Sequence, residues 1–337
     1  MNTIAHGDLR RKLIRPRFLI PALIASAFLL IARTHNQPGF PTDYRDDSAS
    51  HEFEFYNKAR RYFDGSSAIS KRLLSSEQMY QKQIYKRTQY IRKNNYYTGA
   101  WLPKAKEMMP VWWYFQPSFN CPHEVERVGP LNDGAKWMCG MTVLESMKKE
   151  DKCVIYSLGE IDDSSWEKEM IDRTNCQVFV FHASVDKMDG DAAGNSNIHF
   201  FKYYLGGKDE VDKDGTVWKT LKTIMKENGH DWIDVLKIDI EGNEFGALNA
   251  MMDEFDVLPF SQMQIEIHLY DDMEKRKHFM KFVKFWERLE GHHLRPFWSE
   301  LNTIVANWGN SLSLSEYSFI NIADRRRLLV DVKTQLQ

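Results

Sequence analysis

Short apolar runs alternate with amphipathic segments over the second half of the chain. Continuous apolar runs predict buried strands at 153–159, 176–181, 198–205, 233–240 and 262–269, and a late strand pair at 312–323. Between them, apolar positions at helical spacing predict helices at 164–174, 216–227, 243–252 and 274–289. Repeated strand–helix units are typical of a mostly parallel sheet with helices on both faces, so the pattern predicts an α/β fold.

The first third of the chain has a different pattern. Residues 34–64 are polar and lack periodicity, which is typical of a stem or linker. Residues 67–94 place apolar side chains at helical intervals among seven lysines and arginines, which predicts a basic amphipathic helix. Its basic face either is solvated or contacts acidic lipid headgroups or glycans. The aromatic segment 101–119 either packs in the core and docks the stem, or forms the floor of a substrate cleft.

The N-terminus carries an uncharged apolar run, Phe18 to Ala32, behind a basic flank. This arrangement predicts a cytosolic tail and a single-pass, type II membrane anchor, with the rest of the chain in the lumen of the endoplasmic reticulum or Golgi. The alternative is a signal peptide cleaved after Ala25-Ser26-Ala27, which would make the protein secreted. The predicted divisions are a tail at 1–17, an anchor at 18–33, a stem at 34–116 and a catalytic-type domain at 117–330.

The overall composition excludes some classes of protein. With 43% hydrophobic and 27% charged residues the chain can bury a core, so disorder along its whole length is excluded. A formal net charge of −2 gives no electrostatic footprint for nucleic acid, and no nucleic-acid partner is expected. The four cysteines have no spacing that would build a zinc site.

The cysteines are more informative in an oxidising lumen. Cys153 and Cys176 open the first two predicted strands, which are neighbours in a fold of this kind, so we expect their Cα atoms about 5 Å apart and a disulfide between them. Cys121 and Cys139 would then form a second disulfide. The alternative for Cys153 and Cys176 is two free thiols that act as small buried apolar residues.

Charged side chains gather at the carboxyl ends of two predicted strands. Lys237, Asp239 and Glu241 alternate along one strand and share a face, and Glu266 and His268 end the next strand in the same way. Because ligands bind at the carboxyl ends of parallel strands, these groups should converge on one cleft if the strands are neighbours. They could serve as a general base pair, a divalent-cation site or hydrogen-bond acceptors for a cationic ligand. We predict the base pair, and no resident metal.

A family resemblance rests on these residues and a few others. The block Val235 to Gly242, followed by Glu244 and by Gln264 to His268, resembles the signature of FkbM-type methyltransferases. The segments Asp133 to Cys139, Tyr156 to Gly159, Ser165-Trp166 and Trp218 to Ile224 resemble the methyltransferase-like protein 24 group more closely. The resemblance covers roughly 117–323 and implies a Rossmann-like class I methyltransferase that uses S-adenosylmethionine.

The resemblance also implies roles for individual residues. Glu266 or His268 would be the catalytic base, with Asp239 orienting cofactor or acceptor. The implied cofactor-binding residues are Ser157, Gly159, Glu160, His182, Asp239 and Glu241.

Two positions depart from the family pattern. Gly159-Glu160-Ile161 stands where a G-x-G turn is usual, and His182 stands where an acid would accept both ribose hydroxyls. A second function therefore stays open, a lumenal binding or scaffold protein that keeps the fold without catalysis. The methyl acceptor, whether a small molecule, a glycan or a protein, is not specified by the sequence.

Overall fold

The computed structural model describes residues 47–97, 109–159, 163–188, 192–269, 276–308, 312–324 and 326–330. Everything described below belongs to the second of the two units into which the chain divides, residues 47–337. The predicted tail at 1–17 and anchor at 18–33 lie outside the described residues. In the part of the chain that is described, no helix is long and apolar enough to cross a membrane.

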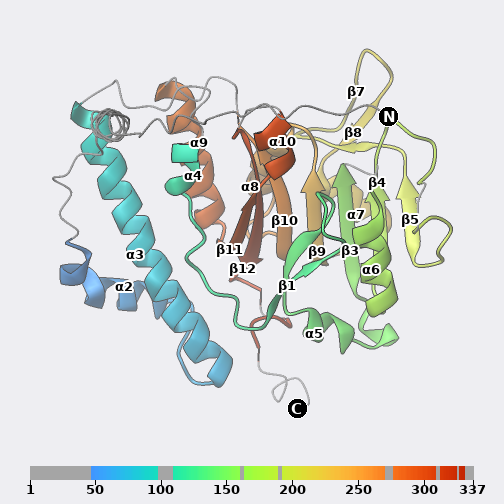
Figure 1. Cartoon of the computed structure of the whole chain (residues 1–337). Coiled ribbons are helices and arrows are strands. Elements are labelled where there is room, and N and C mark those ends of the chain that lie inside the picture. Colours follow the sequence, from blue (N-terminus) through green and yellow to red (C-terminus); the bar gives the residue numbers. More distant parts are fainter. Residues whose placement is uncertain are drawn as a thin grey trace, which may run out of the picture. The chain divides into compact units, whose positions relative to one another are not determined.

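A seven-stranded sheet forms the centre of the second unit (Figure 1). In spatial order its strands are β11 (Leu294–Leu301), β12 (Leu314–Asn321), β10 (Phe260–His268), β9 (Ile233–Asp239), β3 (Val154–Gly159), β4 (Gln177–Phe181) and β5 (Ile198–Phe201). The five strands from β10 to β5 are parallel to one another, and β12 runs antiparallel to both of its neighbours. This mostly parallel sheet confirms the predicted Rossmann-like α/β class.

Different elements cover the two faces of the sheet. On one face lie α7 (Leu221–Asn228), α8 (Glu244–Glu254) and α9 (Arg276–Gly291), whose Ile224, Leu248 and Trp286 are buried in one cluster with Leu236 and Ile265 of the sheet. The other face is covered by α6 (Ser165–Arg173), α5 (Met141–Glu145) and a two-stranded hairpin, β1 (Val125–Val128) and β2 (Lys136–Cys139). Both faces are therefore shielded, as the continuous apolar strands require.

The predicted basic helix is present as α3 (Ala68–Tyr97), preceded by η1 (Ser48–His51) and α2 (Glu52–Ala59). It joins the sheet through two buried ion pairs: Arg295 of β11 with Glu77 at 2.8 Å, and Arg87 with Glu290 of α9 at 2.5 Å. The segment predicted as a stem thus contributes a helix that packs directly on the domain. Part of the expected linker is also helical, since α2 lies within 34–64, and its Phe55 and Ala59 are fully buried.

Part of the predicted aromatic segment lies in the core. After α4 (Met109–Trp113), Phe115 packs against Phe282 and Trp286 of α9 with ring centroids 4.9 Å apart in each pair. Trp112 donates from Nε1 to the carbonyl of Leu312 at 2.7 Å. Of the two uses considered for this segment, Trp112 and Phe115 have the packing use, whereas Trp113 is exposed.

Some elements differ from the pattern-based expectation. The predicted helix 216–227 begins only at Leu221, because the Thr220 side chain caps α7 by accepting from the Thr223 N–H. The residues before it form β8 (Val217–Lys219), which pairs with β6 (Tyr204–Leu205) and β7 (Glu210–Val211) in a small separate sheet.

The late strand pair is also different. Residues 312–323 contain one strand, β12, and its missing partner is β11, a segment with Pro296 at a register shift that hides its strand pattern.

Both predicted disulfides are confirmed. Cys153 and Cys176 are bonded with Cα atoms 4.5 Å apart, and Cys121 and Cys139 with Cα atoms 5.9 Å apart. The first bond joins the amino ends of neighbouring strands β3 and β4, as expected from their order. The second ties the hairpin strand β2 to the segment that leads into it.

Candidate active site

The site is positioned by the point where the strand order reverses. From β3 the chain moves through β4 and β5 toward one edge of the sheet, and it then returns to β9 and continues through β10 toward the other edge. In sheets of this kind ligands bind outside the carboxyl ends of the strands at such a reversal. Here the reversal lies between β3 and β9, where Gly159 and Asp239 are register partners.

The ends of β3 and β9 lie so close together that position 159 requires a glycine. Its φ is +109°, and a Cβ atom at this position would lie 1.5 Å from the carbonyl oxygen of Asp239. A side chain therefore does not fit. The next residue, Glu160, belongs to the implied cofactor-binding set but lies outside the described residues.

Ser157, another residue of that set, is tied into a buried network. Its hydroxyl donates to Glu167 Oε1 at 2.6 Å, and the Lys237 ammonium donates to the same oxygen at 2.9 Å. All three side chains are buried. The lysine of the family-like block therefore neutralises a carboxylate of α6 beneath the cleft, and the hydroxyl proton of Ser157 is engaged by the same carboxylate.

Acidic side chains form a row across four adjacent strands. Glu266 of β10 is the register partner of Glu316 of β12, which is in turn the partner of Glu300 of β11. On the other side Ile265 pairs with Ile238, so Glu266 lies beside Asp239 of β9. Because direct cross-strand neighbours point to the same face, the four carboxylates share the face that the hairpin covers.

The hairpin supplies positive charge to one end of this row. Lys136 of β2 donates to Glu316 at 2.5 Å, and Arg127 of β1 contacts Glu300 at 3.2 Å. Burial lowers the pKa of Lys136, but the charges of Glu316 and Asp239 outweigh this and raise its pKa, so the ammonium is retained. Burial also raises the pKa of Glu316, an effect that Lys136 opposes.

Glu266 lies in the middle of the row and is nearly buried. Its Oε1 accepts from Asn302 Nδ2 at 2.8 Å, and the same amide lies 3.2 Å from Asp133. Burial, together with the negative charges of Asp239 and Glu316, raises the pKa of Glu266 to about 8.

His268 is held by carboxylates on both of its ring nitrogens. Nδ1 lies 2.9 Å from Oε1 of Glu244, a fully buried residue at the start of α8, and Nε2 lies 3.2 Å from Glu241 and 3.6 Å from Glu266. Burial lowers the pKa of His268, but the hydrogen bond and charge of Glu244 outweigh this and raise the pKa to about 9. Glu241 is an exposed residue with a φ of +51°, in the turn that leaves β9.

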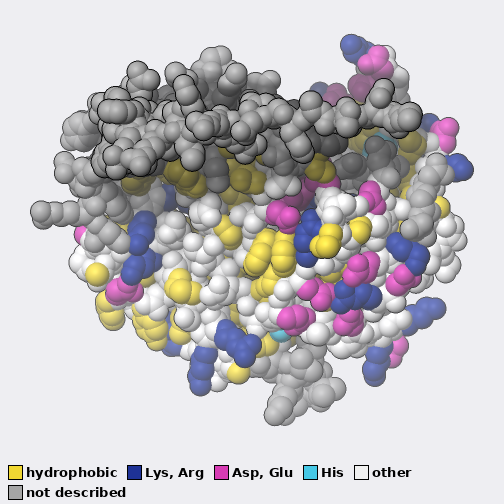
Figure 2. All heavy atoms as spheres, in the orientation of Figure 1, with side chains coloured by type: hydrophobic (Ala, Val, Ile, Leu, Met, Phe, Trp, Pro, Cys, Tyr) yellow, Lys and Arg dark blue, Asp and Glu magenta, His cyan; other side chains and the backbone are white. Residues whose placement is uncertain are grey.

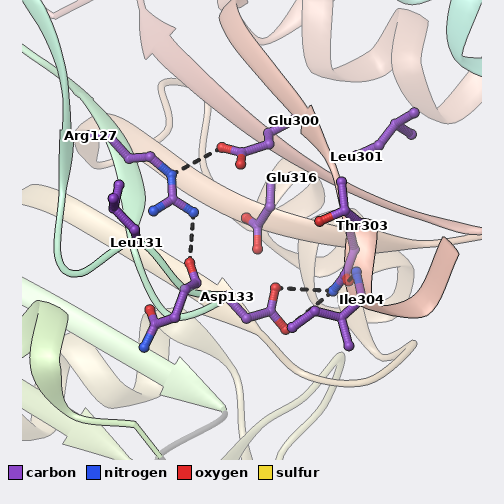
Figure 3. A pocket seen from close by; sticks show the side chains of 10 residues that line it. Arg127, Leu131, Asp133, Glu300, Leu301, Thr303, Ile304 and Glu316 are labelled. Carbon is purple, nitrogen blue, oxygen red and sulfur yellow. Dashed lines mark hydrogen bonds and ion pairs between the residues drawn. The ribbon is translucent and has the colours of Figure 1, made fainter. Parts of the chain in front are cut away.

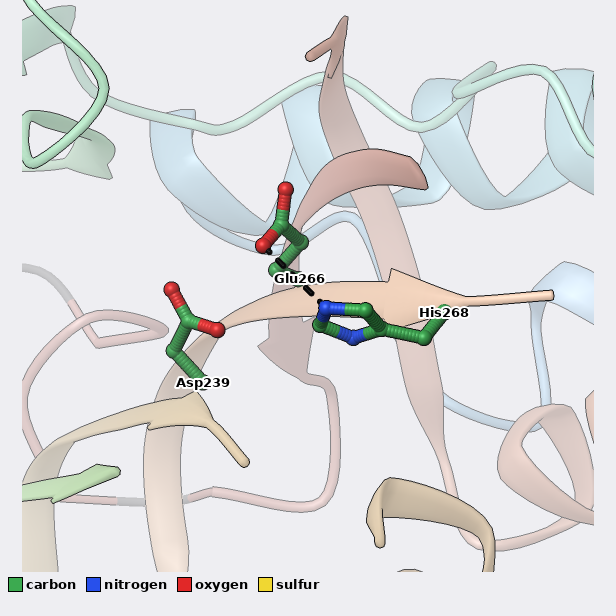
Figure 4. A group of neighbouring side chains, drawn as sticks. All are labelled: Asp239, Glu266 and His268. Carbon is green, nitrogen blue, oxygen red and sulfur yellow. Dashed lines mark ion pairs between the residues drawn. The ribbon is translucent and has the colours of Figure 1, made fainter. Parts of the chain in front are cut away.

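Asp239 completes the cluster. It is 3% exposed, and its Oδ1 has no hydrogen-bond partner among the described residues. Figure 4 shows its carboxylate beside the side chains of Glu266 and His268, and one ligand atom from each of the three lies within 4.8 Å of the others. The structure thus brings together the three side chains predicted as catalytic.

His182 lies apart from this cluster, directly after β4. Its ring packs edge-on against Tyr204 with centroids 5.1 Å apart, and Nδ1 lies 3.2 Å from the Ser184 hydroxyl. The position is the carboxyl end of the strand next to β3, where the family resemblance places the ribose contact.

A pocket of about 340 Å³ opens beside the acidic row (Figure 3). Asp133, Glu300 and Glu316 line its polar part, together with Arg127, which contacts Glu300. Leu131, which is 99% exposed, and Ile304 of α10 (Thr303–Trp308) supply its apolar lining. Elsewhere on the face drawn in Figure 2, the described acidic and basic side chains are interspersed. Asn302, which also lines the pocket, donates to both Asp133 and Glu266 and so connects the pocket wall to the cluster.

A family model described as "Methyltransferase domain" matches residues 75–320. The chain belongs to this family. The match includes most of α3 and the sheet through β12, so it covers the candidate site.

Among curated proteins, the domain is similar to the human "Probable methyltransferase-like protein 24", with 28% identity over 148 residues. The match covers 42% of this chain and 40% of that relative's length. It confirms the resemblance to the methyltransferase-like protein 24 group.

Solved structures show weaker likeness to this methyltransferase domain. The Methanococcus jannaschii fibrillarin pre-rRNA processing protein is 13% identical, with a TM-score of 0.31, over 52% of this chain and 68% of the other. An apo structure of CmcI is 14% identical, with a TM-score of 0.28, over 61% and 82%. Likeness at this level carries no argument about the site.

Sequence reasoning missed part of the candidate site. Lys136, Asn302 and Glu316 come from a hairpin strand, a helix cap and an antiparallel strand, none of which contributes to a strand–helix repeat. Lys136 falls within the Asp133 to Cys139 segment that carries the family resemblance, and that was the only available signal for it.

Proposed function

We propose that this protein is an S-adenosylmethionine-dependent methyltransferase whose cofactor and acceptor meet at the carboxyl ends of β3, β9 and β10. The observation that carries the proposal is the pairing of Gly159 with Asp239 at the reversal of strand order, with Glu266 and His268 beside it. Membership of a methyltransferase-domain family supports it.

The donor set at this edge fits the cofactor. S-adenosylmethionine supplies an electrophilic methyl group on a sulfonium, together with an ammonium, a carboxylate and a ribose. The Asp239 carboxylate, with its unpartnered oxygen, suits the ammonium, and the exposed Glu241 lies in the turn just beyond. His182 is the implied ribose contact, and Ser157, Gly159 and Glu160 would act through the backbone leaving β3.

The acceptor would enter through the pocket beside the acidic row. Its nucleophilic atom attacks the methyl carbon in line, forming the new bond as the sulfur–carbon bond breaks, and its proton leaves to a base. Glu266 and His268 are the predicted bases, held in place by Asn302 and Glu244. The protein's contribution is alignment and proton removal.

We place this activity in the secretory pathway. The two disulfides support an oxidising compartment, because such bonds are rare in the cytosol. Anchoring through Phe18 to Ala32, as a type II membrane protein of the endoplasmic reticulum or Golgi, rests on the sequence, as does the alternative of secretion.

The second candidate function is a binding or scaffold protein with the same fold. It is favoured by the engagement of the Ser157 hydroxyl with Glu167 and by an imidazole at position 182 in place of a carboxylate. A neutral imidazole accepts one hydrogen bond, whereas a carboxylate accepts from both ribose hydroxyls.

Calorimetry on the full chain distinguishes the two. With metal removed by a chelator, S-adenosylhomocysteine and S-adenosylmethionine should each bind at one site, and Asp239→Asn should weaken binding of the amino-acid part about tenfold or more. The matched control is Asp253→Asn, an exposed acid of α8 paired with Arg288. Absence of heat at millimolar cofactor, with a folded protein, would refute the enzyme and favour the scaffold.

A further inference from the structure

We propose that Asp239, Glu266 and His268 bind a divalent cation of the Mn²⁺ type. The sequence alone predicted a base pair and no metal; the side-chain arrangement argues for the cation. The inference does not rest on the proposed methyl transfer, since it concerns a binding event that needs neither cofactor nor acceptor.

The first observation is a buried carboxylate oxygen without a hydrogen bond. Asp239 is 97% buried, its Oδ1 has no hydrogen-bond partner among the described residues, and its carboxylate lies beside Glu266 and His268 (Figure 4). A buried carboxylate oxygen that is left without a hydrogen bond is costly, so such an atom is expected to have a ligand. The charge of Lys136 acts on Asp239 from a distance, but the hydrogen bonds of its ammonium go to Glu316 and to the carbonyl of Asp133.

The second observation is the orientation of His268. Its Nδ1 donates to Glu244, which is fully buried and also accepts from the Gly242 N–H. This leaves Nε2 facing the carboxylates of Glu266 and Glu241 without a hydrogen bond of good geometry. A histidine that ligates a metal usually donates its other ring N–H to a carboxylate in this way.

The third observation is the spacing. Ligand atoms about 2.1 Å from a cation lie about 3 Å apart when adjacent and about 4.2 Å apart when opposite. Here Nε2 of His268 and Oε2 of Glu266 are 3.6 Å apart, and the three ligand atoms lie within 4.8 Å of one another. Glu266 offers Oε2 because Asn302 occupies its Oε1.

The chemistry of the donors selects the kind of cation. Two carboxylates and one imidazole suit a hard to borderline divalent ion such as Mn²⁺, with the remaining coordination positions open toward the cleft. A second acidic group, formed by Asp133, Glu266 and Glu316, shares one member with the first. It is the weaker site because Lys136 neutralises Glu316.

A cation here would change the roles of the predicted bases. Glu266 and His268 would act as ligands, and the positive charge would lower the pKa of an acceptor hydroxyl bound at an open position. Glu244 would then be a positioning residue, because it acts through the ring of His268.

The test uses the full chain, stripped of metal by a chelator and desalted, with no cofactor present. Mn²⁺ is titrated in, and free Mn²⁺ is measured by its electron paramagnetic resonance signal. We expect one saturable site, weakened about tenfold or more by Asp239→Asn and by His268→Gln, and 10- to 100-fold by Glu244→Gln. Glu300→Gln, which removes a carboxylate from the same row outside the ligand set, should bind as the unsubstituted protein does.

Two further readouts keep the result interpretable. Unfolding curves without metal establish that each variant folds, and electron spin echo modulation of the bound Mn²⁺ should show one coupled imidazole nitrogen. Absence of saturable binding at millimolar Mn²⁺, binding unaffected by the Asp239 and His268 substitutions, or bound Mn²⁺ without a nitrogen coupling would each overturn the proposal. Because cofactor calorimetry is done with chelator present, failure of this site and failure of cofactor binding are separate results.

Discussion

Gly159 and Asp239 are register partners at the carboxyl ends of β3 and β9, and the carbonyl oxygen of Asp239 occupies the space that a Cβ at position 159 would take. The contact lies where the order of the strands reverses, so it shapes the floor of the proposed cofactor site. Both the proposed site and the sheet therefore require the backbones of β3 and β9 to pack closely at these two residues.

Substitution at this contact should be costly. Gly159→Ala places a side chain at a φ of +109° and against a backbone atom 1.5 Å away, so strand ends must separate. We expect a loss of about 3 kcal/mol or more in the free energy of unfolding, measured with urea. Gly194→Ala is the control: its φ is +74° with open space around it, and it should lose only about 1–2 kcal/mol. Equal losses would contradict the close-approach argument.

The ion pair between Glu77 and Arg295 should hold α3 to the sheet. Both side chains are almost completely buried, so Glu77→Leu leaves an unpaired guanidinium and should cost about 3–5 kcal/mol in equilibrium unfolding. The double variant Glu77→Leu with Arg295→Met should regain much of that loss. Asp253→Asn, which breaks an exposed pair with Arg288, should cost about 1 kcal/mol or less. A small effect of Glu77→Leu would indicate that α3 is a detachable stem.

The disulfide between Cys153 and Cys176 should stabilise the amino edge of the sheet. Its sequence separation of 23 residues corresponds to about 3 kcal/mol by the chain-entropy relation, so Cys153→Ser with Cys176→Ser should lower the free energy of unfolding by that order. Peptide mapping without reduction should recover this pair and the Cys121–Cys139 pair. Recovery of free thiols at 153 and 176 would contradict the structure.

His230 should make the protein less stable in mild acid. Burial lowers the pKa of His230, the charge of His199 lowers it further, and the charge of Asp231 opposes this effect. The Nδ1 atom of His230 lies 2.7 Å from the Tyr156 hydroxyl. Since the folded-state pKa lies below the unfolded value of about 6.5, the unfolded chain binds more protons as pH falls, and stability declines below that pH.

The His230 prediction is tested by unfolding at pH 7 and pH 5.5. His230→Phe should reduce the difference in unfolding free energy between the two conditions. Tyr156→Phe removes the hydroxyl but keeps the imidazole between Phe179 and its neighbours, so it should retain the difference. The same pH dependence in all three proteins would show that other groups cause it.

The alternating strands and helices of this fold could be predicted from the sequence. The runs around Val235 and Ile265 are continuously apolar because both sheet faces are covered, and their charged ends marked the cleft where Asp239, Glu266 and His268 meet. The strand order also led from the cysteine positions to the correct pairing.

The rest depended on contacts between distant segments. Strand β11 contains Pro296 and the buried Arg295, whose partner Glu77 is 218 residues away, so no local pattern reveals it. Lys136 meets Glu316 across 180 residues, which is why the positive side of the acidic row was not predicted. The local hydrophobic pattern indicates which face of a helix or strand is buried. It does not indicate which charged residues pair across a long sequence separation.

Hydrogen–deuterium exchange of the full chain with and without S-adenosylhomocysteine tests the central claim most directly. The account predicts slower exchange at the amides that leave β3, β4 and β9, around Gly159, His182 and Glu241, with little change at the distant end of the sheet near Cys153 and Cys176. Unchanged exchange at saturating ligand, or protection confined to another part of the molecule, would contradict a cofactor site at the Gly159–Asp239 contact.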